Sequence, residues 1–249
     1  MNALQTEWAR LYAANAGHSA DSLVAPDGRV RALVLGLSRP ADWHALSVLW
    51  RGVQSGLRLP APAIAVTGVD GLDLWFSLAE PIAATEAQAF LQSLCQRFLP
   101  DVAPARLHLL PGLHDSVLHH AMPVPARQAH AERWSAFVAP DLAAIFAEEP
   151  WLEACPSPEA QASVLARIRS ITPAAFATAW QDLQGDRPSL APAASANTAA
   201  VAVDPLPASP ASPAKSDLDP RRFLQDVLNN PAHDMALRIA AASALLPKA

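Results

Sequence analysis

The sequence is 249 residues long and 51% hydrophobic, and it carries a formal net charge of −5. This length and apolar content indicate a globular protein with one sizeable core and room for a smaller element. Because proteins that hold a phosphate backbone carry a surplus of positive charge, the acidic balance argues against strong, sequence-indifferent binding to nucleic acid.

Cysteine usage and hydropathy indicate the expected compartment. Cys95 and Cys155 lie far apart in the sequence, and we expect no structural disulfide in a reducing cytoplasm. No apolar run of about 18 residues occurs, and the first residues lack the basic and apolar segments of a signal peptide. We therefore expect a cytoplasmic protein that does not associate with membranes.

The first 112 residues alternate between helical and strand-like patterns of apolar residues. In chain order we expect a helix at 3–14, a strand at 29–38, a helix that begins at Asp42 and ends at Gly56, strands at 63–66 and 72–78, a helix capped by Thr85, and a strand at 106–110. From residue 29 on, the order is strand, helix, strand, strand, helix, strand. This predicts an α+β fold in which a split βαβ unit of the ferredoxin or RRM type forms an antiparallel sheet with two helices on one face.

Three further regions accompany this predicted core at 29–112. Residues 134–185 have helical patterns interrupted by prolines, so we expect a helical extension that completes one α+β domain at 1–185. Residues 186–217 are rich in Ala, Pro and Ser and contain no aromatic residue, which predicts a disordered linker. Residues 218–249 predict a separate helical hairpin.

The predicted C-terminal hairpin begins at Asp219, an N-cap followed by proline at the first helical position. Its apolar stripes include Phe223, Leu224, Val227 and Leu237. Because a hairpin of about 30 residues is too small to be stable alone, we expect these side chains to dock on a protein partner or on the chain's own domain. The stretch also resembles a short helical segment of phage small-terminase packaging proteins, which implies a similar docking role.

The stretch AIAVTGVDGLDLWFSLAEP contains two strand-like runs joined by a tight turn. Gly68 and Gly71 are expected to supply positive φ angles in that turn. Because side chains alternate along a strand, Leu74 and Phe76 should face the helices and Trp75 should face the opposite side of the sheet.

Together with its neighbours, this hairpin resembles the palm domain of archaeo-eukaryotic-type primase-polymerases. The similar segments are LVLGLS, WHALSVLWRGVQ, AVTGVDGLDLWFSLAEP, EAQAFLQSLCQRF and RLHLLPG. They follow one another in the order and spacing of the palm, over residues 30–112. The resemblance implies a palm-like sheet and an association with DNA replication or mobile-element complexes.

Two departures from the palm pattern bear on catalysis. Where the family has an Asp-x-Asp pair for two metal ions, this chain has Gly36, Leu37 and Ser38, and where the family has a histidine after the hairpin glycine, it has Asp73. Nucleotidyl transfer needs at least two carboxylates that converge on divalent cations. The resemblance therefore implies a palm that has lost its catalysis, and we expect a non-catalytic binding or adaptor module without metal or cofactor.

The candidate binding residues are Asp70, Asp73, Trp75, Arg106 and His108. Two alternatives stay open. In the first, Asp70, Asp73 and His108 replace the usual ligands, and the protein is a metal-dependent enzyme for nucleotidyl transfer or nucleic-acid processing. In the second, it is an interaction protein unrelated to nucleic acid. The acidic charge favours the binding module and the interaction protein over the enzyme.

Histidines gather in HDSVLHHAMPVPARQAH, after the last predicted strand. His114, Asp115 and His119 are residue types that ligate zinc or iron. Their spacing fits no compact zinc motif, however, and no paired cysteine accompanies them. We expect a solvent-exposed loop here and not a metal site.

Overall fold

The computed structural model describes residues 2–14, 22–114, 117–129 and 132–185. The chain divides into two compact units, 1–191 and 192–249. The linker predicted at 186–217 and the hairpin predicted at 218–249 lie outside the described residues, as do the docking residues Phe223, Leu224, Val227 and Leu237.

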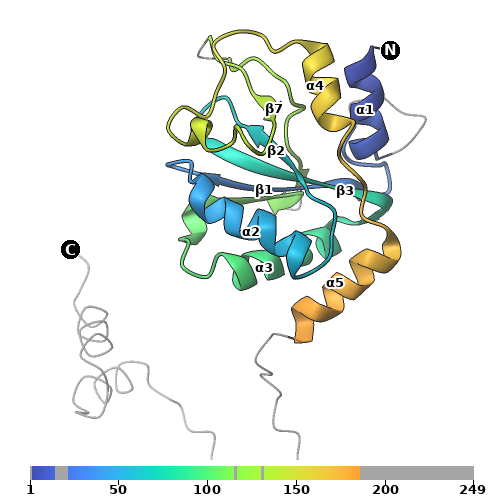
Figure 1. Ribbon diagram of the computed structural model, residues 1–249. Coiled ribbons are helices and arrows are strands. Elements are labelled where there is room, and N and C mark those ends of the chain that lie inside the picture. The colour runs from blue at the N-terminus through green and yellow to red at the C-terminus, as the bar shows by residue number, and fades with distance from the viewer. Residues whose placement is uncertain (1, 15–21, 115–116, 130–131, 186–249) are drawn as a thin grey trace, which may run out of the picture. The chain divides into compact units, whose positions relative to one another are not determined.

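A five-stranded antiparallel sheet forms the centre of the first unit (Figure 1). Its strands, in spatial order, are β4 (Leu107–Leu110), β1 (Arg29–Ser38), β3 (Gly71–Ala83), β2 (Ala63–Val66) and β7 (Ala136–Val138). The α+β class and the antiparallel sheet predicted from the sequence are confirmed. The spatial order β4-β1-β3-β2 is also that of a split βαβ unit.

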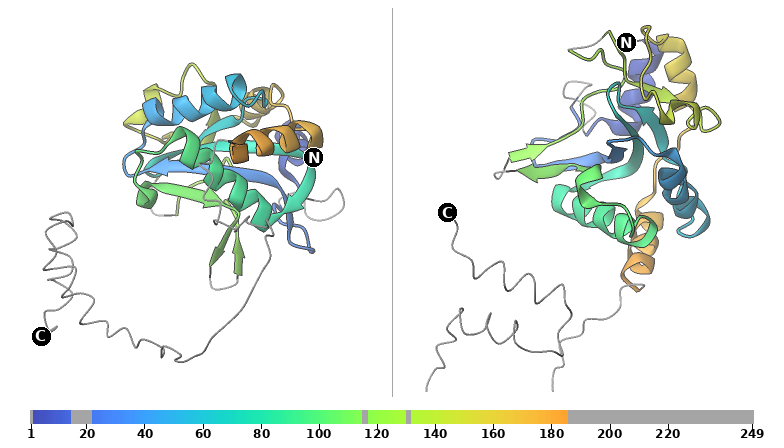
Figure 2. Two further views of the ribbon diagram at one scale, coloured as in Figure 1. Left: turned by 90° about the horizontal axis from the view of Figure 1, so that it is seen from below. Right: turned by 90° about the vertical axis from the view of Figure 1, so that its left-hand side faces the viewer.

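Helices cover both faces of this sheet (Figures 1 and 2). One face carries α2 (Trp43–Ser55) and α3 (Ala84–Phe98), with α5 (Pro173–Gly185) packed against α3; the other carries α1 (Ala3–Tyr12) and α4 (Pro158–Leu165). The cap predicted for α2 is present, because the side chain of Asp42 accepts a hydrogen bond from the backbone N–H of Ala45 at 3.0 Å. In the described part of the chain, no helix is long and apolar enough to span a membrane.

The alternation of side chains along the strands divides the core into two halves. Leu74 and Phe76 of β3 lie in the half that contains α2 and α3, whereas Trp75 lies in the half that contains α1. The predicted side of all three residues is confirmed. The ring of Trp75 packs edge to face against Tyr12 at a centroid distance of 5.2 Å and against Phe137 at 5.7 Å. These buried aromatic contacts hold α1 on the sheet.

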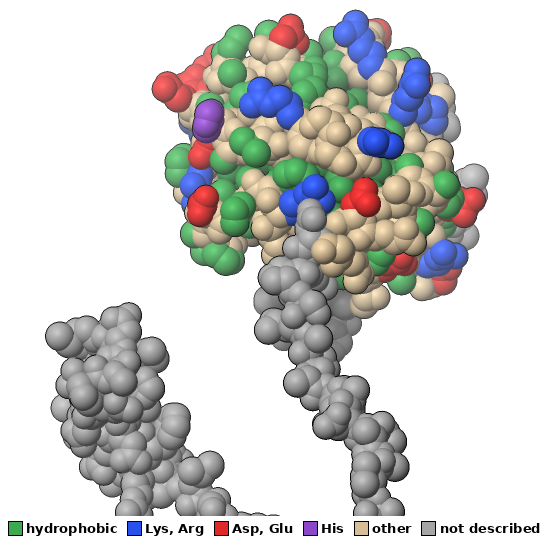
Figure 3. Space-filling model, turned by 60° about the horizontal axis from the view of Figure 1, so that its bottom comes forward, with side chains coloured by type: hydrophobic (Ala, Val, Ile, Leu, Met, Phe, Trp, Pro, Cys, Tyr) green, Lys and Arg blue, Asp and Glu red, His purple; other side chains and the backbone are tan. Residues whose placement is uncertain are grey.

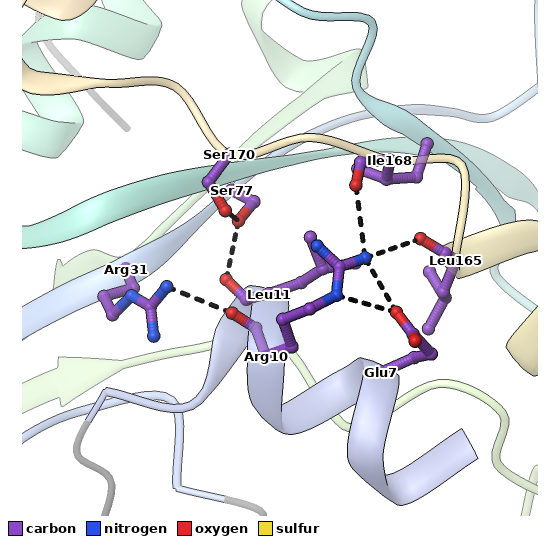
Figure 4. Close-up of polar contacts among 8 residues, drawn as sticks. All are labelled: Glu7, Arg10, Leu11, Arg31, Ser77, Leu165, Ile168 and Ser170. Carbon is purple, nitrogen blue, oxygen red and sulfur yellow. Dashed lines mark hydrogen bonds and ion pairs between the residues drawn. The ribbon is translucent and has the colours of Figure 1, made fainter. Parts of the chain in front are cut away.

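Polar contacts tie the end of α1 to the sheet and to the segment that follows α4 (Figure 4). The last carbonyls of a helix have no partner within the helix. Here the guanidinium of Arg31 donates to the carbonyls of Arg10 and Ala13. The hydroxyl of Ser77 donates to the carbonyl of Leu11. The side chain of Arg10 in turn donates to two carbonyls at and just after the end of α4, so α1 and α4 form a braced cover over one sheet face.

The outer edge of β7 is closed by one side chain. The amide of Gln161, on α4, accepts the backbone N–H of Phe137 at 2.7 Å and donates to the carbonyl of the same residue at 2.9 Å. Gln161 thereby replaces the hydrogen bonds that a further strand would make, and it covers an edge that would otherwise be open to pairing.

The turn between β2 and β3 uses its two glycines in different ways. Gly68 has a φ of +82°, as predicted. The prediction of a positive φ at Gly71 is wrong: a Cβ there would lie 2.9 Å from the carbonyl oxygen of Leu37 and 2.8 Å from the Cβ of Ser38. Gly71 is therefore required by the close approach of β1 and β3 and not by backbone conformation.

The extension predicted as helical at 134–185 is only partly so. Residues 136–138 form β7, and residues 140–147 form turns with a short 3₁₀ helix at Ile145–Ala147. This stretch buries Ala143 and part of Phe146 but leaves Leu142 and Ile145 44% and 70% exposed, and a short helix with so little buried apolar surface is not stable. Only α4 and α5 in this region are α-helices.

Two local predictions are also corrected. The helix predicted to be capped by Thr85 begins two residues earlier than that cap implies, at Ala84, and its N-cap residue Ala83 makes no side-chain cap. The segment predicted as a loop after β4 contains two short strands, β5 (Gly112–His114) and β6 (Val117–His119), which pair as an antiparallel hairpin. This hairpin projects from the body of the unit (Figure 2).

Candidate functional site

Two predicted residues, His108 of β4 and Asp73 of β3, meet across the strand that separates them. Nε2 of His108 lies 2.6 Å from Oδ1 of Asp73, the length of a strong hydrogen bond to a charged group. In the sheet register both residues pair with Gly36 of β1. The side chains therefore reach over the one residue of β1 that has no side chain.

Gly36 makes this contact sterically feasible. A Cβ at this position would overlap Nε2 and Cε1 of His108 and Oδ1 of Asp73, so any other residue would force the pair apart. In the sequence, Gly36 is interpreted only as a position that lacks the carboxylate of the palm pattern. The signal for its actual role was a single glycine inside an otherwise apolar strand, a pattern typical of close approach by another group.

The surroundings of His108 favour its protonated form. Burial by itself lowers the pKa of His108, but the hydrogen bond to Asp73 and the charges of Asp73 and Asp70 outweigh burial and the opposing charge of Arg39, so this pKa is raised above its usual value. The side chain of His108 is 34% exposed and that of Asp73 only 13%. Because Nδ1 of His108 makes no hydrogen bond to a described residue, the pair presents an oriented imidazole with one nitrogen available to a ligand.

The predicted residue Arg106 and its neighbour Arg39 brace the same corner of the sheet. Arg106 donates to the carbonyl of Pro40 at 2.9 Å and lies 3.8 Å from the carboxylate of Asp42. Arg39 donates to the carbonyl of Ala105 at 3.1 Å. These contacts join the chain that leaves β1 to the chain that enters β4, and they hold His108 beside Gly36.

The remaining predicted residues, Asp70 and Trp75, do not contact the pair. The backbone N–H of Asp70 donates to Oγ1 of Thr67, and its carbonyl accepts the N–H of Arg39, so its position in the turn is determined by its main chain. Its carboxylate acts on His108 through charge alone. Trp75 lies on the same face of β3 as Asp73 but is fully buried, and its ring is a core contact.

The described residues include no group of three His, Cys, Asp or Glu side chains that could hold a metal ion. The set of Asp70, Asp73 and His108 required by the enzyme alternative therefore does not form a three-ligand site. The arrangement also lacks a nucleophile, because no serine, threonine or cysteine side chain in the described part of the chain hydrogen-bonds to His108. An imidazole oriented by a carboxylate is the base of a nucleophilic triad only when a nucleophile is within its reach.

The histidine-rich segment contains one histidine with a clear structural role. In His120, Nε2 donates to the carbonyl of Ala32 at 2.9 Å and Nδ1 accepts the N–H of Ala121 at 2.7 Å. Burial lowers the pKa of His120 to about 4, against a smaller opposing effect of that carbonyl. His120 is thus a neutral structural residue with both ring nitrogens engaged, while Asp115 and His130 lie outside the described residues.

Comparison with known proteins gives no family or relative from which a function for these residues could be inferred. No protein-family model matches the sequence, and no curated protein matches it either. The candidate site is therefore defined by geometry: the His108–Asp73 pair over Gly36, at the corner formed by β4, β1 and β3.

Proposed function

We propose that this chain is a non-catalytic binding module on a palm-like sheet, in which the His108–Asp73 pair contacts the ligand and polymerase chemistry has been lost. The observation that carries the proposal is that the side chains of His108 and Asp73 fill the space beside Gly36. A palm presents an acidic metal ligand from this strand, whereas a carboxylate at position 36 would overlap the side chains of His108 and Asp73. The pair and a two-metal centre therefore exclude one another at this corner.

The helices α1 and α4, which cover part of the same sheet face, leave only a small area for contact with nucleic acid. Nucleic-acid-binding sheets of the RRM type stack bases on an open sheet surface. Here α1 and α4 cover the part of that face that contains Trp75 and Phe137 (Figure 1). The corner with His108 remains partly exposed, and recognition on this face would involve it alone.

The distribution of charge supports weak binding of nucleic acid at most. On the side of the molecule shown in Figure 3, the Lys and Arg side chains lie dispersed among acidic and apolar ones and form no continuous stripe. With a net charge of −5, the chain lacks the positive surplus that strong phosphate binding requires. We propose that the protein takes part in a replication or mobile-element complex, and that residues 218–249 make the protein contact through which it enters that complex.

Fluorescence anisotropy with a labelled single-stranded oligonucleotide at low salt tests the binding site. We expect weak, saturable binding that declines as salt is added, and a marked further loss in His108→Gln. His44→Gln is the matched control, because His44 is exposed and lies on α2, which covers the opposite face of the sheet. If His108→Gln and His44→Gln bind as the wild type does, the corner is not the contact site.

Two further measurements separate the alternatives. Calorimetry with Mn²⁺ and a nucleoside triphosphate should give no binding heat, whereas heat that disappears in Asp73→Ala would favour the metal-dependent enzyme.

Deletion of residues 217–249 should remove partners that a pull-down with the full chain recovers. An unchanged set of partners would contradict the docking role.

A further inference from the structure

An apolar groove of about 360 Å³ lies at the sheet edge opposite to the His108–Asp73 pair. It is formed where the start of β2 and the end of β7 meet α2 and the end of α4. Most of its wall is hydrophobic and includes Trp50, Pro62, Ile64, Val138, Val164 and Ile168. Its volume falls at the small end of the range of roughly 300–1,000 Å³ that is typical of ligand sites.

One cationic side chain, which is exposed to solvent, contributes to this otherwise largely apolar lining. Arg167 lines the groove, and its guanidinium makes no hydrogen bond or ion pair with any residue that the structure describes. The two other polar groups are already engaged, because the indole N–H of Trp50 donates to the carbonyl of Pro62 at 3.1 Å and the hydroxyl of Ser163 donates to that of Glu159 at 2.9 Å. Among the described lining residues none is acidic. Among the described lining residues, the guanidinium of Arg167 is thus the side chain that has hydrogen-bond donors to offer to a ligand.

We propose that this groove binds a small amphiphilic carboxylate, with its apolar chain or ring against Trp50 and Ile168 and its carboxylate paired with Arg167. The planar fork of donors on a guanidinium matches the two oxygens of a carboxylate. A sugar or a nucleotide fits poorly, since its hydroxyls would be left without partners against the apolar walls. A cationic ligand is repelled by Arg167. This site does not depend on the function proposed above, because the two lie at opposite sheet edges.

Isothermal titration of the full chain with hexanoate, octanoate and decanoate, each below its micellar concentration, tests the proposal. We expect saturable binding at one site, tighter by about fourfold for each added methylene group. Arg167→Gln should weaken octanoate binding about threefold, because an ion pair of an exposed guanidinium is lost, and should leave binding of 1-octanol unchanged. Arg169→Gln is the matched control, since Arg169 is exposed, lies two residues further on and does not line the groove.

A second variant tests the location of the apolar part. Ala61 is partly exposed and lines the groove, so Ala61→Phe should fill it and abolish octanoate binding while the thermal unfolding midpoint stays close to that of the wild type. The absence of saturable heat with all three acids overturns the proposal. It is equally overturned by an affinity that does not depend on chain length, or by an Arg167→Gln variant that binds octanoate as tightly as Arg169→Gln does.

Discussion

Adding one methyl group at Gly36 tests whether the His108–Asp73 pair depends on an empty position in β1. A Cβ at position 36 overlaps ring atoms of His108 and Oδ1 of Asp73, so Gly36→Ala must open the pair. The imidazole is the group that can move, because it is 34% exposed and belongs to the edge strand β4. The carboxylate, 13% exposed, stays beneath it without its partner.

The cost of this change follows from the carboxylate left behind. Loss of a hydrogen bond to a charged group costs about 1.5–3 kcal/mol, and the lower half of that range applies because His108 is one-third exposed to solvent. Alanine gains about 0.5–1 kcal/mol over glycine inside a strand. We therefore expect Gly36→Ala to lower the free energy of unfolding by about 1 kcal/mol, the difference between these two terms.

Urea unfolding near pH 6 measures this change in stability. The sign of the change should reverse in a chain from which the His108–Asp73 pair has been removed. In a chain that already carries His108→Ala and Asp73→Ala, the overlapping atoms are gone, so Gly36→Ala should stabilise the protein by about 0.5–1 kcal/mol. NMR titration should also show that the pKa of His108 is lower in the single variant Gly36→Ala than in the wild type, because the pair is open in the variant. If Gly36→Ala has the same effect in both backgrounds, the pair does not depend on the glycine and the steric argument is refuted.

Three other predictions concern charge, the sheet edge and the cover helix. Because the pKa of His108 is raised in the folded protein, its stabilising effect is complete below the unfolded value of about 6.5 and is lost as pH rises through the folded value. Urea titrations from acidic to alkaline pH should therefore show the difference between wild type and His108→Gln shrinking as pH rises, and a constant difference would contradict the raised pKa. Gln161→Leu removes two hydrogen bonds to β7 and should destabilise the protein by about 2–3 kcal/mol in thermal denaturation, whereas the exposed control Gln181→Leu should have little effect. Arg31→Met loses three hydrogen bonds to carbonyls of α1, β3 and the chain that follows α1, so amide exchange in α1 should accelerate relative to the exposed control Arg29→Met; unchanged exchange would show that Arg31 does not hold the cover.

The main elements of the sheet were predictable because their signals are local. The apolar run of β1, the cap at Asp42 and the turn at Gly68 each depend on a few adjacent residues. Strand β7 was not predictable, since three residues are too few to show an alternating pattern and its pairing with β2 arises from tertiary contact. The same reason applies to the short hairpin of β5 and β6.

The geometry of the candidate site could not be predicted from the sequence. Asp73 and His108 are both candidate binding residues in the sequence analysis, but their contact depends on β4 and β3 flanking β1 and on Gly36 pairing with both residues. Alternation correctly predicted which face Trp75 occupies. It did not predict that Trp75 is inaccessible, because the cover comes from α1 through Tyr12, a contact distant in sequence.

One row of residues across the sheet limits how strongly the proposed site can bind a ligand. In register order the row runs His108, Gly36, Asp73, Ala65 and Phe137, so it is polar at the β4 end and apolar at the covered β7 end. On the function proposed above, a ligand on this face therefore contacts mainly the imidazole of His108, which is 34% exposed. A hydrogen bond of this kind contributes about 1–3 kcal/mol, whereas micromolar affinity corresponds to about 8 kcal/mol. On the function proposed above, a ligand held at this corner reaches micromolar affinity only with a second attachment, because that attachment raises the local concentration.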